Sequence, residues 1–138
     1  MSKALGFAVE LPLAFDAAVN RVKEELKREG FGILTEIDLR AAFRDKLGRD
    51  FRPYLILGAC NPPLAFDAIT ADPSVGLLLP CNVTVEWISD ERTGVRLTDP
   101  EALLSNVTLE AAPALASVSR DAHGRMRRVA DALAGERQ

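Results

Sequence analysis

The sequence predicts an α+β fold in which helices pack on one mainly antiparallel sheet. Strand-like and helix-like segments alternate along the first half of the chain, which favours a mixed layered fold. Two neighbouring strand patterns, 82–88 and 95–97, are separated only by a polar turn, and such a hairpin argues against a purely parallel sheet. Hydrophobic residues form 48% of the 138 residues, enough for a sizeable core. We expect residues 1–138 to form a single compact domain.

The N-terminal segments predict a strand followed by a long amphipathic helix. Residues 4–10 have the pattern of a short strand. The next apolar residues are spaced four, three and four apart, which places them on one helical face. They are Phe15, Val19, Val22 and Leu26. Gly30 is suited to the left-handed residue that ends this helix.

The next strand and helix follow from alternation and capping. Residues 31–37 predict a strand, and a period of two places its alternate residues on one face. These residues are Phe31, Ile33, Thr35 and Ile37. Asp38 is suited to cap the following helix, which we expect to end at Gly48.

An apolar run then predicts the centre of the sheet. Residues 54–60 are almost all apolar, as expected of a strand buried on both faces. Asn61 is a suitable N-cap, with Pro62 at the first helical position. The helix should stop before Pro73, because the residue preceding a proline avoids helical geometry.

The C-terminal half predicts a hairpin and two helices. Strand 82–88 is followed by polar turn residues 89–94 and a returning strand 95–97. Asp99 before Pro100 indicates a short helix. The last helix starts between residues 109 and 112 and carries an apolar stripe spaced three or four residues apart.

Composition excludes several functional classes. The net charge is −3, so the chain lacks the basic excess that nucleic-acid binding requires. No apolar stretch approaches 18 residues, so we expect no membrane span. The N-terminus lacks the pattern of a signal peptide, which favours the cytoplasm. The two cysteines are then expected to be free thiols.

A duplicated dipeptide directs attention to one region. Cys60-Asn61 and Cys81-Asn82 each adjoin a proline, and each lies where an apolar run meets a break. If the intervening helix returns the chain only part-way, both thiols lie at the same edge of the sheet. Two close thiolates bind a soft ion such as Cu(I) or form a reversible disulfide. The alternative is that both cysteines are buried apolar residues. No zinc site is expected, because no CxxC pair or neighbouring histidine is present.

Four further residues have both a functional and a structural interpretation. Asn61 is explained by capping, whereas Asn82 either donates to a ligand or holds the loop at Cys60. Glu36 and Asp38 are two residues apart and share a strand face, so they form a candidate acid–base pair. Their simpler interpretation is a solvated strand end and a helix cap.

Three segments together resemble the domain of unknown function 302 family of bacteria and archaea. They are Gly30–Asp38, Leu57–Ala65 and Gly76–Val83, in that order. The resemblance extends over residues 7–134. It implies a compact α+β domain that often forms homodimers, and it implies no established reaction, substrate or cofactor. The family motif corresponds here to Glu36, Asp38, Cys60, Asn61, Pro62, Pro63, Pro80, Cys81 and Asn82.

One departure from the family pattern limits the chemistry. Phe66 stands where family members commonly have a histidine, so this chain has no imidazole there for a metal. The cofactor is therefore left unknown.

The sequence supports three functional hypotheses. The favoured one is a cytoplasmic homodimer that binds a small molecule or a soft metal beside the two Cys-Asn dipeptides. Its candidate site residues are Glu36, Asp38, Cys60, Asn61, Pro62, Cys81 and Asn82. The second hypothesis is a thiol redox protein or enzyme that uses Cys60 or Cys81. The third is a structural or protein-interaction domain that uses the C-terminal helix.

Overall fold

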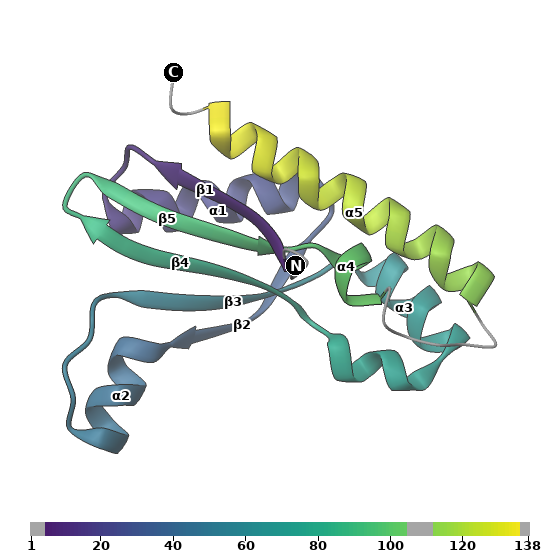
Figure 1. Ribbon diagram of the computed structural model, residues 1–138, viewed down its shortest axis with the longest axis horizontal. Coiled ribbons are helices and arrows are strands. Elements are labelled where there is room, and N and C mark those ends of the chain that lie inside the picture. Colours follow the sequence, from purple (N-terminus) through teal and green to yellow (C-terminus); the bar gives the residue numbers. More distant parts are fainter. Residues whose placement is uncertain (1–4, 105–111, 136–138) are drawn as a thin grey trace, which may run out of the picture.

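The strands form one antiparallel sheet in the order β1-β5-β4-β3-β2. The computed structural model describes residues 5–104 and 112–135. The strands are β1 (Gly6–Leu11), β2 (Gly32–Asp38), β3 (Tyr54–Cys60), β4 (Cys81–Ser89) and β5 (Arg92–Thr98). Helices packed on an antiparallel sheet confirm the predicted α+β fold class (Figure 1).

The helices divide into three groups. The two longest are α1 (Phe15–Arg28) and α5 (Ala112–Gly135), and they cover one face of the sheet. The helices α3 (Pro62–Ala71) and α4 (Pro100–Leu104) both contact α5, beside a 3-10 helix η1 (Pro73–Leu78). Helix α2 (Leu39–Leu47) lies apart from α1 and α5, next to β2 and β3 (Figure 1).

The core lies between the sheet and the helices α1 and α5. Leu57 and Val85 are fully buried on the sheet, opposite Leu26 of α1. The apolar stripe of α5 completes this core, with Met126 and Leu133 both fully buried. The stripe is therefore used inside the chain, and the hypothesis of a C-terminal interaction helix loses its apolar contact face.

The helix ends agree with the predicted local signals. Gly30 and Gly48 adopt positive φ angles of 86° and 62° after α1 and α2. The Ala41 amide donates to Asp38 Oδ1 over 3.0 Å, and the Leu64 amide donates to Asn61 Oδ1 over 3.4 Å. Both predicted caps are therefore confirmed.

The hairpin is longer than predicted. Strand β4 begins at Cys81 and β5 at Arg92, so only Asp90 and Glu91 remain in the turn. Residues 92–94 look like turn material locally, yet Thr93 pairs with Leu11 and Gly94 with Glu10 on β1. This pairing satisfies their backbone groups and extends the strand.

The predicted face of β2 is wrong, because the pairing of β2 with β3 shifts between Ile33 and Thr35. Ile33 lies opposite Ala59 and packs against the core. Thr35 lies opposite Gly58, and Ile37 is 46% exposed. A β-bulge adds one residue to the strand, so it reverses the alternation beyond it.

Other boundaries differ by a few residues. The segment before Pro80 is the 3-10 helix η1, with the Ser74 amide bonded to Asp72 Oδ1 over 2.9 Å. Helix α5 is described from Ala112, and the range 109–111 for its predicted start lies outside the described residues. Across residues 5–104 and 112–135, no helix combines the length and apolarity needed to cross a membrane.

Candidate functional site

Cys60, Asn61 and Cys81 line one cavity of about 50 Å³. It lies at the end of the sheet where α3 begins, between β3, β4 and the helices α3, α4 and α5. Its other described lining residues are apolar, and they include Phe31, Leu64, Ala65, Ala68, Val75, Leu103, Leu104, Val118 and Ala122. Three of the seven candidate site residues therefore line this largely apolar cavity, and two of the three carry thiols.

Antiparallel pairing brings the two cysteines together. Strand β3 ends at Cys60, β4 begins at Cys81, and Cys81 lies opposite Ala59, the neighbour of Cys60. The approach depends on Gly58, because a Cβ there would lie 2.8 Å from Pro80 Cγ. The Leu79–Pro80 peptide is cis, and Pro80 immediately precedes Cys81.

Burial makes Cys81 a poor nucleophile. Its exposed fraction is 8%, and burial raises the pKa of its thiol to about 11. The charge of the nearby Cys60 makes a smaller contribution to this increase than burial does. Because the thiolate is the reactive form, Cys81 is inert near neutral pH. The thiol-enzyme hypothesis therefore depends on Cys60, which is unpaired and partly exposed.

We expect Cys81 to make the protein less stable in alkaline solution. A thiol whose folded-state pKa is raised favours the folded state below its ordinary pKa of 9.0, and this contribution is lost as pH rises to about 11. Urea denaturation at pH 8 and pH 10.5 should show a smaller decrease in unfolding free energy for Cys81→Ala than for the wild type. Equal decreases in the two proteins would contradict this prediction.

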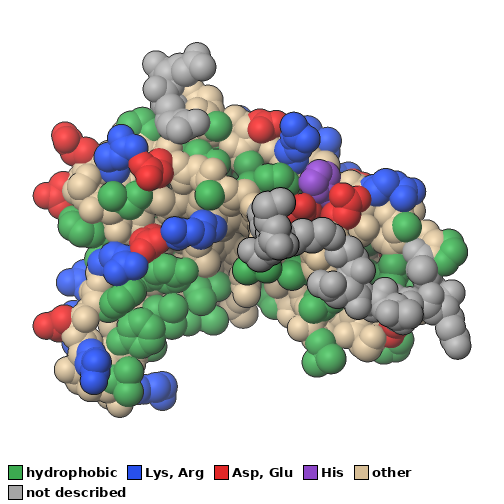
Figure 2. Space-filling view, in the orientation of Figure 1, with side chains coloured by type: hydrophobic (Ala, Val, Ile, Leu, Met, Phe, Trp, Pro, Cys, Tyr) green, Lys and Arg blue, Asp and Glu red, His purple; other side chains and the backbone are tan. Residues whose placement is uncertain are grey.

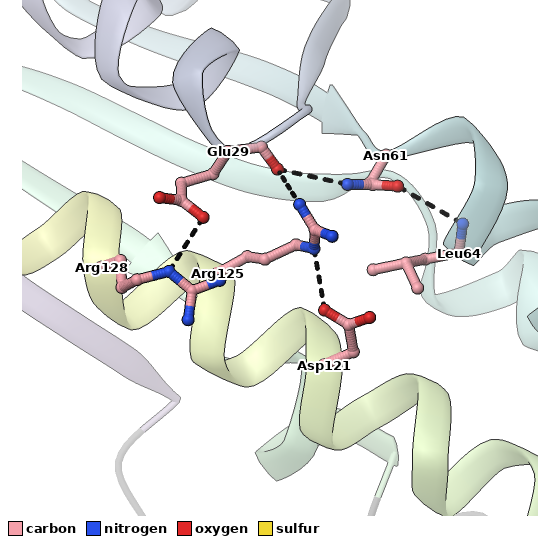
Figure 3. A network of polar contacts seen from close by, with 6 residues as sticks. All are labelled: Glu29, Asn61, Leu64, Asp121, Arg125 and Arg128. Atoms are coloured by element: carbon pink, nitrogen blue, oxygen red, sulfur yellow. Dashed lines mark hydrogen bonds and ion pairs between the residues drawn. The ribbon is translucent and has the colours of Figure 1, made fainter.

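Asn61 joins three elements beside the cavity (Figure 3). Its Oδ1 accepts the Leu64 amide hydrogen bond that caps α3, while its Nδ2 donates to the Glu29 carbonyl over 3.3 Å. Arg125 of α5 donates to the same carbonyl through Nη1 over 2.9 Å. Asn61 is only 7% exposed. Its amide therefore serves the fold, and it connects the end of α1 to α3 and α5.

Two ion pairs surround this junction. Arg125 Nε lies 2.8 Å from Asp121 Oδ1, and Arg128 Nε lies 3.0 Å from Glu29 Oε1 (Figure 3). A Cβ on Gly30 would lie 2.9 Å from Asn61 Nδ2, so a glycine is required there for close approach as well as for its positive φ. No local sequence pattern indicates that Arg125 and Arg128 contact Glu29, because Glu29 lies about a hundred residues earlier in the chain.

Asn82 lies on the other face of the sheet. Successive residues in a strand point to opposite faces. Cys81 packs into the core, while Asn82 lines a hollow of about 370 Å³ with Tyr54 and Arg96. The two Cys-Asn dipeptides therefore do not form two equivalent sites, because Cys81 and Asn82 lie on opposite faces of the sheet.

Glu36, Asp38 and Pro62 do not line the cavity. Glu36 pairs with Lys23 of α1 over 3.1 Å, and Asp38 caps α2. Pro62 is exposed in the first turn of α3. Each has a local structural role, and their proposed part in ligand binding stays a prediction.

His123 and Asp99 form a contact that the sequence did not indicate. His123 Nδ1 lies 2.8 Å from Asp99 Oδ1, and Asp99 also accepts the Glu101 amide over 3.0 Å. The histidine side chain is 28% exposed and packs on Phe7, with ring centroids 5.6 Å apart. This contact joins α4 to α5, and both helices form walls of the cavity.

The described residues offer little to a hard metal ion. Within 5–104 and 112–135, no group of three or more histidine, cysteine or acidic side chains is placed to hold one. Cys60 and Cys81 provide two thiols at the cavity, and thiolates preferentially bind soft metal ions.

Comparisons with known proteins agree with this architecture. The family model for a domain of unknown function, DUF302, matches residues 7–133. A crystal structure of an uncharacterized conserved DUF302 protein from Bacillus stearothermophilus is similar, with a TM-score of 0.80 and 28% identity. The match covers 95% of this chain and 99% of that chain. No curated protein matches this sequence.

Proposed function

This chain belongs to the DUF302 family, and from that premise we propose that it is a homodimeric module that binds a small apolar molecule. The binding site is the cavity between Cys60 and Cys81. The observation that carries the proposal is the convergence of both cysteines on one apolar space at the end of the sheet. We place this activity in the cytoplasm, where unpaired thiols stay reduced.

The lining of the cavity supports a small and apolar ligand. Both ends of the Asn61 amide already bond to the protein, so the two thiols are the polar groups left to contact a ligand. Apolar cavities stay dry and bind apolar molecules, and a cavity of about 150 Å³ accepts benzene or xenon. At about 50 Å³, this cavity suits a molecule of only a few non-hydrogen atoms.

Filling the cavity should abolish binding. Ala65 is a partly buried lining residue on α3, and Ala65→Leu would place three more carbons in the space. We expect xenon and 1-propanol to give saturable shifts in the methyl NMR signals of the lining residues. Ala65→Leu should weaken this binding by at least about tenfold, a loss of about 1.4 kcal/mol.

The matched control is Ala17→Leu, which makes the same change on the exposed side of α1. It should bind both probes as the wild type does. No saturable shift in the wild type would overturn the proposal. Equal binding by Ala65→Leu and the wild type would show that the probes bind elsewhere, and would also overturn it.

A soft metal is the second candidate ligand. The Cys60 charge acts on the Cys81 thiol, so the two sulfur atoms share one environment. Cu(I) binds thiolates and would have to displace the proton that burial keeps on Cys81. A Cu(I) titration against a competing chelator should then lose its protein-bound fraction in both Cys60→Ser and Cys81→Ser. Unchanged binding in either variant would exclude the two-thiol site.

Self-association is supported by the surface that α1 and α5 leave uncovered. Residues 32–56 include no buried side chain, although many of them are apolar. Helices and strands gain most of their stability from burying an apolar face, so this stretch needs a covering partner. The homodimer supplies that partner.

A further inference from the structure

One continuous part of the chain contains no fully buried residue, although Ile33 and Leu55 pack against the core. It comprises β2, α2, the connection to β3 and the first three residues of β3, residues 32–56, and we name it the lobe. A nine-residue helix such as α2 is only marginally stable unless it packs on something. Helix α2 has no buried residue, and its main contacts are with β3. Helix α2 therefore lacks the burial that normally stabilises a helix of this length.

The lobe carries exposed apolar side chains. Leu47 on α2 is 64% exposed, and Ile37 on β2 is 46% exposed. Aromatic rings connect α2 to the sheet, with Phe43 and Phe51 centroids 5.3 Å apart and Phe51 and Tyr54 centroids 6.4 Å apart. The space-filling view shows hydrophobic side chains gathered on this face between a charged strip and α2 (Figure 2). An apolar surface of this kind marks an interaction site.

The other half of the same sheet face is hollow. A depression of about 740 Å³ lies over β1, β5 and β4. Its lining combines the small residues Ala8 and Gly94 and the 41% exposed Ile88 with charged side chains. The charged lining residues are Glu10, Arg52, Glu86 and Arg96. One half of the face thus protrudes while the other half recedes.

We propose that the lobe of one copy of this chain docks into the hollow of a second copy, and that the second copy returns the same contact. This inference rests on the self-association in the proposed function and not on ligand binding. The strand order places β1 and β2 at opposite edges of the sheet. When the two sheets face each other, a two-fold axis parallel to the central strand β4 therefore places the lobe of each copy against the hollow of the other. Two-fold dimers of this kind are the commonest homo-oligomers.

The charges favour a second copy as the occupant. Helix α2 exposes three basic residues, Arg40, Arg44 and Lys46, against one acidic residue, Asp45. The far side of the face exposes Glu10, Asp90 and Glu91 together with one basic residue, Arg92, which pairs with Glu10, so its net charge is negative. The proposed axis brings the basic helix toward this acidic side, and such complementarity fixes the register of an interface.

The middle of the face carries paired charges with one positive charge in excess, because two arginines share one glutamate. Glu86 Oε1 accepts from Arg96 over 2.6 Å, and Glu86 Oε2 accepts from Arg52 Nε over 2.6 Å. The hydrogen bond from Arg96 lowers the pKa of Glu86, so the carboxylate stays ionised and paired. Arg52, Glu86 and Arg96 also line the hollow, so a docked lobe meets charges that are already paired within the chain.

Leu47→Glu tests the surface directly. It places a charge on the exposed side of α2 without removing a buried contact. Sedimentation velocity of the wild type should give twice the 15.0 kDa mass of the chain. In Leu47→Glu the dimer dissociation constant should rise at least about 30-fold, the effect of losing a hot-spot residue. Circular dichroism should show an unchanged fold.

The matched control is Leu77→Glu, because Leu77 is 89% exposed on η1, away from this face. It should remain dimeric. If Leu47→Glu does not fold, Ala8→Arg tests the same interface from the hollow, and this variant should also be monomeric. A wild type that is monomeric at all concentrations would overturn the proposed self-association itself. A dimer that survives both Leu47→Glu and Ala8→Arg would overturn only this surface.

Discussion

Gly58→Ala should lower the free energy of unfolding by about 3 kcal/mol. A Cβ at this position would lie 2.2 Å from Thr35 Oγ1 and 2.8 Å from Pro80 Cγ, far inside van der Waals contact. Both neighbours would have to move, and Pro80 immediately precedes Cys81. We therefore expect the variant to disturb the cavity as well as stability, with changed methyl NMR signals for the lining residues. Urea denaturation of the purified protein measures the loss.

Gly76→Ala is the matched control for Gly58→Ala. A Cβ at Gly76 would meet no atom within 4 Å, so its stability should change by less than about 1 kcal/mol. Adding Thr35→Ala to Gly58→Ala removes the hydroxyl that lies nearest to the new methyl group. The double variant should recover part of the stability lost in Gly58→Ala, because the effects of substitutions at neighbouring residues are not additive. A Gly58→Ala protein as stable as the wild type would refute the packing argument.

Asn61→Ala should cost about 2–3 kcal/mol, the combined effect of losing a helix cap and a buried hydrogen bond. The substitution removes the acceptor for the Leu64 amide and the donor to the Glu29 carbonyl. Asp38→Ala provides a comparison, because Asp38 also caps a helix but is exposed. Its expected cost is about 1 kcal/mol.

A double-mutant cycle distinguishes the network from a simple cap. Arg125 donates to the same Glu29 carbonyl as Asn61, so Arg125→Met and Asn61→Ala should be coupled. Additive effects of the two substitutions would show that Asn61 acts only through α3. Such a result would remove the proposed connection between α1, α3 and α5 at the cavity.

The predictions that held are those made from local signals. Gly30 and Gly48 end helices, and Asp38 and Asn61 begin them. These features depend on the backbone preference of one residue or on hydrogen bonds within one turn. The apolar run at 54–60 correctly predicted a strand, β3, but its predicted central place and burial on both faces are wrong. The central strand is β4, and Tyr54, Leu55 and Ile56 are only partly buried.

The predictions that failed concern strand register and partners. The alternation of β2 predicted one face, but the shift between Ile33 and Thr35 reversed it. The tertiary structure extended β5 to Arg92, because Thr93 and Gly94 pair with β1 about eighty residues earlier in the chain and Arg92 pairs with Ser89 of β4. No local pattern states which distant strand will supply the missing hydrogen bonds.

The candidate site also combines features that are visible in the local sequence with features that depend on tertiary contacts. The sequence by itself identified Cys60, Asn61 and Cys81, because an apolar run that meets a break next to proline is visible locally. Only the tertiary structure decided that these three line one cavity while Asn82 lies on the opposite face of the sheet. It also decided that His123 meets Asp99 and that Arg125 meets Glu29. The physical reason is that strand pairing and helix packing determine which side chains meet, and both depend on contacts between residues far apart in the chain.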